Sequence, residues 1–95
     1  MTADSVNFEM PPLMKVEDCA AFFTFLQNTA GKSVSLQCGE VTRITGLAAQ
    51  MILFAAHKWA AENAPFQMVD LSAGCIESLD ILGMTEILSQ EGVIA

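Results

Sequence analysis

A threonine followed by a glycine, at positions 45 and 46, is the strongest candidate for chemistry in this sequence. The pair stands where an extended segment turns into a long apolar helix, so the Thr45 hydroxyl lies at a helix N-terminus. Such a hydroxyl can cap the helix, which contributes about 1 kcal/mol. It can also accept a phosphate group, whose charge of about −1.5 to −2 would meet the positive end of the helix dipole. The residues favour capping, and phosphorylation of Thr45 is the second hypothesis.

Other residue types that support catalysis or metal binding stand alone or far apart. The one histidine, His57, falls inside the apolar helix with no carboxylate at an informative spacing, and is interpreted as a residue on the helix rim. The cysteines Cys19, Cys38 and Cys75 lie in apolar segments, which is typical of core residues in a reducing cytoplasm rather than of a zinc site. No glycine-rich phosphate loop or nucleophile-elbow motif is present. We therefore predict a protein that is not an enzyme and holds no metal or cofactor.

The composition predicts one small domain and argues against several classes of partner. The 95 residues, 53% of them hydrophobic, can bury a single core spanning residues 1–95. The net charge of −7 and the scattered positions of four basic residues argue against nucleic acid and against anionic membrane surfaces. No stretch reaches the roughly 18 apolar residues of a membrane span. Because the N-terminus also lacks a signal-peptide pattern, we expect a cytoplasmic location without membrane insertion.

The spacing of apolar residues predicts strands and helices in alternation. Apolar residues alternate with polar ones in the strand candidates and recur every three to four positions in the helix candidates. Prolines 11 and 12 should end the first strand, Gly31 should close the first helix, and Pro65 should stop the second. The predicted strands are residues 6–10, 34–38 and 66–71, with a short edge strand at 93–95, and the predicted helices are 15–30, 46–62, 75–82 and 84–89.

This order of elements predicts an α/β domain. Strands that alternate with helices form a mainly parallel sheet, here of about four strands, with the helices packed on it. The first helix is expected to pack on the sheet through Cys19, Phe22, Phe23 and Leu26, with Phe25 partly exposed.

Several stretches resemble the STAS domain, which is the fold of anti-sigma factor antagonists and of the cytoplasmic tail of sulphate transporters. The central one is the strand, loop and helix over residues 34–62. Residues 66–72, followed by Leu79 and by Leu82-Gly83-Met84, resemble the last strand of the family and the end of the helix after it. Residues 12–14 resemble the entry to the first helix in stand-alone bacterial members, some of them linked to chemotaxis. The resemblance spans most of the chain, and it implies a signalling module.

The resemblance also implies a phosphorylatable Ser or Thr at the N-terminus of the second helix. Two ungapped alignments are open. Matching Gly46-Leu47 to the Gly-Leu of the family places Ile44 at the acceptor position. Matching residues 51–53 to the apolar triplet of the family, with Gln50 on a glutamine common in some members, places Thr45 at the family's aspartate and Gly46 at the acceptor. Neither alignment puts a hydroxyl there, so either Thr45 substitutes by a slip of one residue or the domain binds its partner without phosphorylation.

The second helix carries two adjacent stripes of residues, and at least one must face the sheet. We assign the stripe with small residues to the interior because it packs closest: Ala49, Ile52, Leu53, Ala56 and Ala60. The other stripe, at spacings i, i+3, i+4, i+7 and i+11, is then exposed beside the loop: Leu47, Gln50, Met51, Phe54 and Lys58. An exposed apolar stripe usually marks an interface. The alternative is that both stripes belong to the core.

Taken together, the residues and the resemblance predict protein–protein interaction as the function. The partner would be an anti-sigma factor, a kinase-like ATPase domain or another signalling protein, docked on loop 40–46 and helix 46–62. The alternatives are a constitutive structural subunit or homodimer, and a STAS component of a lipid-transport complex that binds a small or lipid ligand. The predicted partner-binding residues are Arg43, Ile44, Thr45, Gly46, Leu47, Gln50, Met51 and Phe54.

Overall fold

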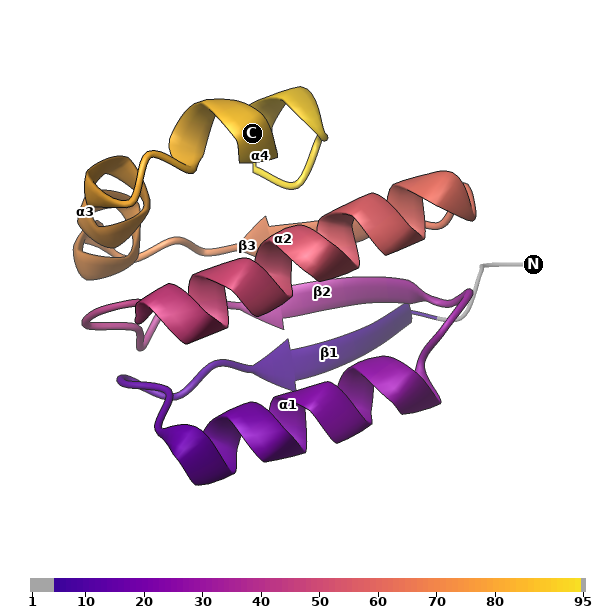
Figure 1. Cartoon of the computed structure of the whole chain (residues 1–95), viewed down its shortest axis with the longest axis horizontal. Helices are drawn as coiled ribbons and strands as arrows, with labels where there is room; N and C mark the ends of the chain where they lie inside the picture. Colours follow the sequence, from indigo (N-terminus) through magenta and orange to yellow (C-terminus); the bar gives the residue numbers. More distant parts are fainter. Residues whose placement is uncertain (1–4, 95) are drawn as a thin grey trace.

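A computed structural model describes residues 5–94, which form three strands and four helices (Figure 1). The predicted α/β class with a parallel sheet is confirmed, although the sheet of this range has three strands where about four were predicted. The strands are β1 (Ser5–Glu9), β2 (Ser33–Gln37) and β3 (Phe66–Val69), and the helices are α1 (Val16–Asn28), α2 (Gly46–Ala61), α3 (Ala73–Ile81) and α4 (Thr85–Gln90).

The short edge strand predicted at 93–95 does not form over Val93 and Ile94, and Ala95 lies outside the described residues. The chain turns at Gly92, where φ is +77°, and then buries Val93 and Ile94. The Val93 carbonyl accepts one hydrogen bond from the Met68 amide at 2.8 Å. The segment therefore contacts the edge of β3 through a single backbone hydrogen bond, which does not make a strand. Its two apolar side chains are buried in the core.

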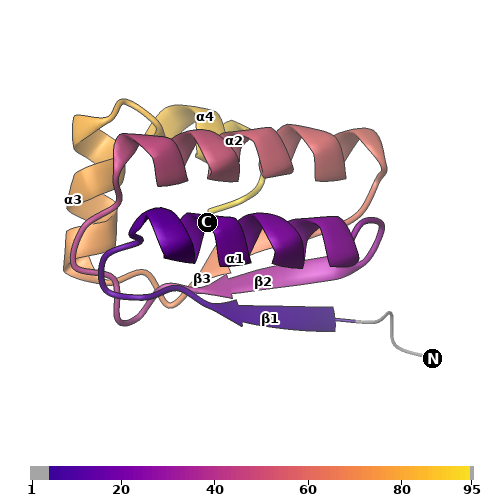
Figure 2. The same ribbon diagram turned by 60° about the horizontal axis from the view of Figure 1, so that its bottom comes forward.

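Helices α1 and α2 cover the same face of the sheet, as Figure 2 shows. The strands follow the order β1-β2-β3, and all pairs are parallel. Because parallel crossovers are almost always right-handed, two successive crossovers in one direction place both helices on one side. Leu36 of β2 is paired with Phe8 of β1 on one side and with Met68 of β3 on the other, so apolar side chains form a continuous row beneath the helices.

The opposite face of the sheet is polar, and no helix of the described chain covers it (Figure 2). Parallel sheets are usually covered on both faces. Polar residues alternate with apolar ones along the strands except at Val69 of β3, which is paired with Gln37, so burial on one side accounts for most of the pattern. The polar residues on this face are Ser5, Asn7, Glu9, Ser33, Ser35, Gln37 and Gln67.

The core lies between the sheet and the two helices that cover it. Trp59 and Phe22 are the largest side chains that are fully buried. The indole Nε1 of Trp59 donates a hydrogen bond to the Lys32 carbonyl oxygen at 2.7 Å, so its polar atom has a partner. This bond joins α2 to the loop that enters β2.

The predicted packing of α1 on the sheet is correct for Cys19, Phe22 and Leu26 but wrong for Phe23, which is 50% exposed. Phe25 is half-buried, and its ring packs on that of Phe8 with centroids 4.8 Å apart. Both phenylalanines flank the buried stripe of the helix. The β1 edge supplies an aromatic partner for Phe25, whereas Phe23 lies on the side that faces α2.

The three cysteines are free thiols and are buried, as expected for core residues. The Cys38 thiol, directly after β2, donates a hydrogen bond to the Leu36 carbonyl oxygen at 3.4 Å. The neighbouring Cys75 thiol of α3, together with burial, raises the pKa of Cys38 well above its ordinary value. Burial, with a smaller effect of Asp18, also raises the pKa of Cys19. Cys38 and Cys19 therefore keep their protons at neutral pH.

Helix α3 lies close against the loop that precedes α2. A Cβ atom on Gly74 would overlap the Thr42 carbonyl oxygen and would lie 2.8 Å from its carbonyl carbon. Both are backbone atoms, which cannot move aside as a flexible side chain can. The absence of a side chain at Gly74 is thus what lets the helix and the loop pack together.

We predict that Gly74→Ala lowers the free energy of unfolding by about 1–3 kcal/mol, because either the helix or the loop must shift. Gly46→Ala is the matched control, since Gly46 is also in the first turn of a helix and a Cβ there meets nothing within 4 Å. That change should be neutral or stabilise the protein by up to about 1 kcal/mol. Urea denaturation measures both, and equal effects of the two substitutions would contradict the close packing of α3.

We predict that Cys19 and Cys38 react slowly with Ellman's reagent in the native protein at neutral pH, because thiolate and not thiol is the nucleophile. All three cysteines should react promptly in denaturant. Prompt reaction of Cys38 in the folded chain, identified by mass spectrometry of the labelled peptide, would show that the loop after β2 opens readily.

The raised pKa of Cys38 also predicts how stability depends on pH. Above about pH 8.5 the unfolded chain releases this proton while the folded chain keeps it, so the free energy of unfolding should fall as pH rises. Urea titrations at neutral and alkaline pH measure the fall. The contact between the two thiols in turn lowers the pKa of Cys75, which burial alone would raise, so the two cysteines are tested together. In a variant with both Cys38→Ala and Cys75→Ala, which is less stable at every pH, the fall should be shallower. An unchanged slope would mean that neither thiol contributes to the fall.

Candidate functional site

The carboxyl ends of the three strands meet at one edge of the sheet, where the loops leading to α1, α2 and α3 lie side by side. The amide and the hydroxyl of Thr42 both donate to the Pro12 carbonyl oxygen, at 2.9 and 2.8 Å. On the other side, the Ser72 amide donates to the Cys38 carbonyl oxygen at 3.2 Å, and the Ser72 hydroxyl donates to that of Val41. The middle loop is therefore held from both sides, at the edge where open parallel sheets bind ligands.

Thr45 caps α2, as the first hypothesis predicted. Its Oγ1 accepts a hydrogen bond from the Ala48 amide at 3.3 Å, and its backbone is extended, with φ −78° and ψ 161°. The side chain is half-buried. The cap fixes where α2 begins, and with it the direction in which the first turn points its side chains. Phosphorylation of Thr45 stays a prediction.

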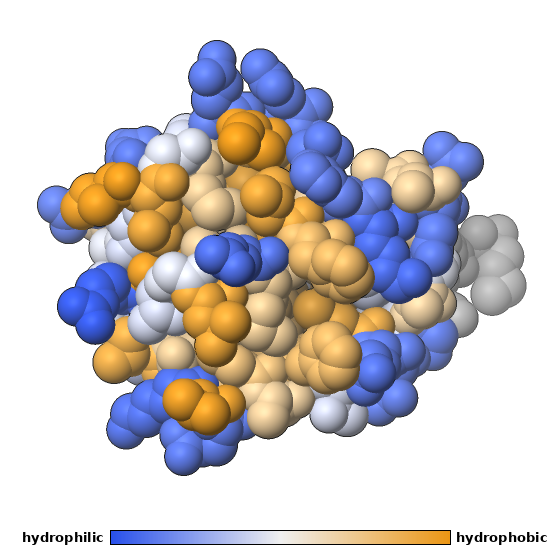
Figure 3. All heavy atoms as spheres, in the orientation of Figure 1, coloured by the Kyte–Doolittle hydropathy of each residue, from blue (hydrophilic) through white to orange (hydrophobic). Residues whose placement is uncertain are grey.

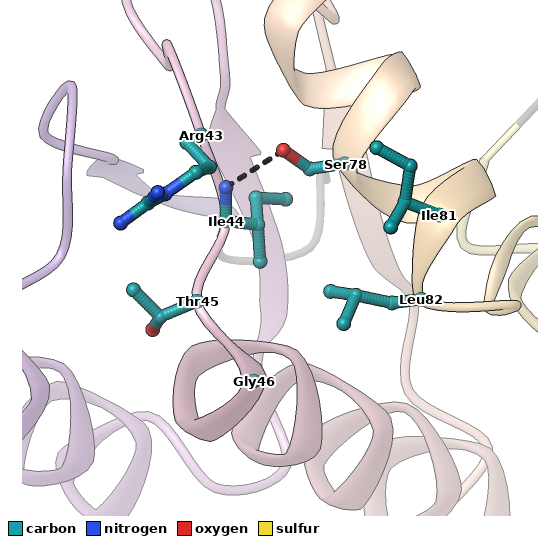
Figure 4. A pocket seen from close by; sticks show the side chains of 7 residues that line it. All are labelled: Arg43, Ile44, Thr45, Gly46, Ser78, Ile81 and Leu82. Atoms are coloured by element: carbon teal, nitrogen blue, oxygen red, sulfur yellow. Dashed lines mark hydrogen bonds between the residues drawn. The ribbon is translucent and has the colours of Figure 1, made fainter.

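Ile44 does not belong to the exposed surface, in contrast to its predicted role in partner binding. Its side chain is 5% exposed, and its amide donates to the Oγ of Ser78 at 3.0 Å (Figure 4). In the segment before α2, Val41 and Ile44 face the core while Thr42 and Arg43 face solvent. Ile44 therefore anchors the loop to α3, and Arg43 is the neighbour that remains accessible.

An open depression of about 340 Å³ lies between the start of α2 and α3 (Figure 4). Ile81 and Leu82 point across it toward Ile44, whereas Arg43 and Thr45 point to the other side. Ile81 is 78% exposed. Reasoning from the sequence missed both Ile81, the last residue of α3, and Leu82, its C-cap.

A second depression, of about 360 Å³, lies on the other side of the α2 N-terminus, between α1 and α2. Val16 of α1 and Leu47 of α2 line it, together with Lys15 and Arg43. A smaller hollow further along the same two helices is lined by apolar and polar side chains of both: Phe23, Leu26, Gln27, Phe54, Lys58 and Trp59. We call the surface made by both the α1–α2 groove.

The exposed stripe of α2 is confirmed for Leu47 and Phe54, which are 54% and 62% exposed, whereas Lys58 is half-buried. Gln50 and Gly46 are also exposed, and Met51 is half-buried. Figure 3 shows apolar side chains gathered over this helical face. The alternative that both stripes belong to the core is therefore wrong.

The inward stripe of α2 is confirmed for Ala49, Ile52 and Ala56, which are buried. Leu53 is half-buried, but Ala60 is exposed. Ala60 borders a hollow beside the turn after α4, so the last turn of the helix is not fully covered.

His57 is an exposed residue of α2, with Nε2 3.5 Å from the Glu91 carboxylate, a pair that is ionic only when the imidazole is protonated. It lies three turns from Thr45 along the helix. Within residues 5–94, no cluster of three or more histidine, cysteine, aspartate or glutamate side chains could hold a metal ion. None of the helices in this range is both long and apolar enough to cross a membrane.

Of the predicted site residues, the fold brings Arg43, Thr45, Leu47 and Phe54 to one helical face and places Ile44 beneath it. The α1 side of the groove was not predicted. Comparisons of the chain with models of known protein families, with curated proteins and with solved structures find no match. The resemblance to STAS domains therefore rests on the residues quoted for it and stays a prediction.

Proposed function

We propose that this protein is a non-enzymatic interaction module that docks a partner protein on α2 and the loop before it, in the manner of an anti-sigma factor antagonist. The partner class, an anti-sigma factor, a kinase-like ATPase domain or another signalling protein, comes from the STAS resemblance. One observation carries the proposal: Leu47 and Phe54 stand more than half exposed on a helix whose start is capped and clamped. Large apolar side chains on a rigid element are the usual anchors of protein interfaces.

Two other functions could use the same surface. A constitutive subunit or homodimer would cover it permanently, and a component of a lipid-transport complex would bind an apolar ligand there. The net charge of −7 opposes association of two copies, because like charges repel across a symmetric contact. The two hollows of the groove are open to solvent rather than enclosed, which suits a protein partner better than a small apolar molecule.

We predict that Phe54→Asp abolishes capture of the partner from extracts of the cells that produce the protein, because the substitution places a charge where an apolar anchor must be desolvated. Ile76→Asp is the matched control, since Ile76 is 47% exposed on α3 and does not line the groove. Quantitative mass spectrometry of the captured proteins, followed by titration calorimetry with the purified partner, measures the difference. Equal capture by both variants would place the interface elsewhere.

We predict that Thr45→Ala lowers the free energy of unfolding by about 1 kcal/mol, because the amide of Ala48 loses its acceptor. Thr45→Ser keeps the hydroxyl and should restore most of the loss. Urea denaturation of the three proteins measures the effect. Mass spectrometry of the protein purified from its native cells tests phosphorylation separately, and a phosphate on another residue would remove Thr45 as the acceptor.

A further inference from the structure

We infer that the groove receives an acidic amphipathic helix of the partner, laid along the valley between α1 and α2. This inference rests on the proposed function and adds the chemistry of the partner and the second wall of its binding site. The shape of the groove and the distribution of charge support it independently.

The shape follows from two pairs of apolar side chains that face each other across the helices. Val16 and Leu47 line one hollow, and Phe23 and Phe54 line the other. Each pair member is seven residues from its successor on the same helix, which corresponds to two turns and about 10.5 Å. A partner helix repeats its own apolar face at the same interval, so it can fill both hollows at once.

The charge follows from where the few basic residues stand. The chain has eleven acidic residues and four basic ones, yet Lys15, Arg43 and Lys58 all line the groove and no carboxylate of residues 5–94 lines either hollow. No ion pair within residues 5–94 involves Lys15 or Arg43, whereas Lys58 contacts Glu62 at 3.1 Å. An acidic helix would meet cations at both ends of the groove.

A second copy of this chain fits the groove less well than an acidic helix does. Its own groove is lined by three of the four basic residues, so a symmetric contact would set Lys15 and Arg43 of each copy close to the cations of the other. Outside the groove, α3 is complementary in charge, since Ile76 and Ile81 are exposed beside Glu77 and Asp80. Its two exposed isoleucines are five residues apart, however, so they do not match the interval of seven residues that separates the two hollows.

The test uses two synthetic helical peptides that differ only in charge. Both carry leucine at spacings i, i+4, i+7 and i+11, and the remaining outward positions are glutamate in one and lysine in the other. The net charge of −7 alone would favour the lysine peptide, whereas the groove should favour the glutamate peptide. Fluorescence anisotropy at physiological salt, where distant charges are screened, measures the two affinities.

Matched variants separate the groove from the overall charge. Arg43→Glu should weaken binding of the glutamate peptide by on the order of tenfold. Lys32→Glu, which changes the net charge equally at an exposed position outside the groove, should leave the affinity within about twofold. Amide chemical shifts should move in both α1 and α2, Val16 and Phe23 included.

Three results would overturn the inference. Preference for the lysine peptide, or equal effects of Arg43→Glu and Lys32→Glu, would show that the basic rim does not select the partner. Binding to vesicles of anionic lipid that is lost in Arg43→Glu would identify a lipid surface as the occupant. A dimer in light scattering that Phe54→Asp dissociates would identify a second copy.

The native partner distinguishes this inference from the proposed function. Capture of the partner that depends on Phe54 but not on Arg43 would support the proposed interaction through α2 and contradict the inference that the partner contributes an acidic helix. Capture that depends on neither residue would remove both.

Discussion

The structure depends on burying a parallel sheet from one side only. Three strands place Phe8, Leu36 and Met68 on one face and polar residues on the other, so only two long helices are needed to cover the apolar row. Two helices packed side by side on a sheet leave a valley between them on the outer surface, and its floor here is formed by residues such as Leu26 and Trp59. The groove is thus a consequence of one-sided burial, and the apolar residues on its walls are a separate feature of the sequence.

The position of that groove is set at the carboxyl edge of the strands. The loop before α2 is hydrogen-bonded to Pro12 on one side, and Ile44 is bonded to Ser78 of α3 on the other. The Thr45 cap then fixes the first turn of α2, so that Leu47 meets Val16 rather than α3. Because backbone bonds hold this corner, a partner would find a preformed surface, which lowers the conformational cost of binding.

Local patterns predicted the elements well, and distant contacts account for the errors. Alternation identified the strands, Thr45 was correctly identified as a cap, and Ala49 and Ala56 correctly marked the inner side of α2, although Ala60 did not. The exposed Phe23 could not be told from the half-buried Phe25, because the difference depends on Phe8, in a strand 15 or more residues away. Ile44 was misplaced for the same reason, since its burial requires α3. A fourth strand was predicted from three apolar residues whose burial, at Val93 and Ile94, has another cause.

The α1 wall of the groove illustrates what a single helix cannot reveal about a site. Val16 is 79% exposed and, taken alone, is a surface apolar residue of the kind that needs no explanation. Val16 forms part of a site only together with Leu47, and Phe23 does so only together with Phe54. These pairs exist because the topology places α1 next to α2, with both helices starting at the same edge of the sheet. The same adjacency brings Lys15 to Arg43, through the bridge between Leu13 and Arg43. Two basic residues that lie far apart in the sequence of an acidic protein thereby stand together on its surface. Such a local positive charge can select an acidic partner, which the negative net charge of the protein would repel.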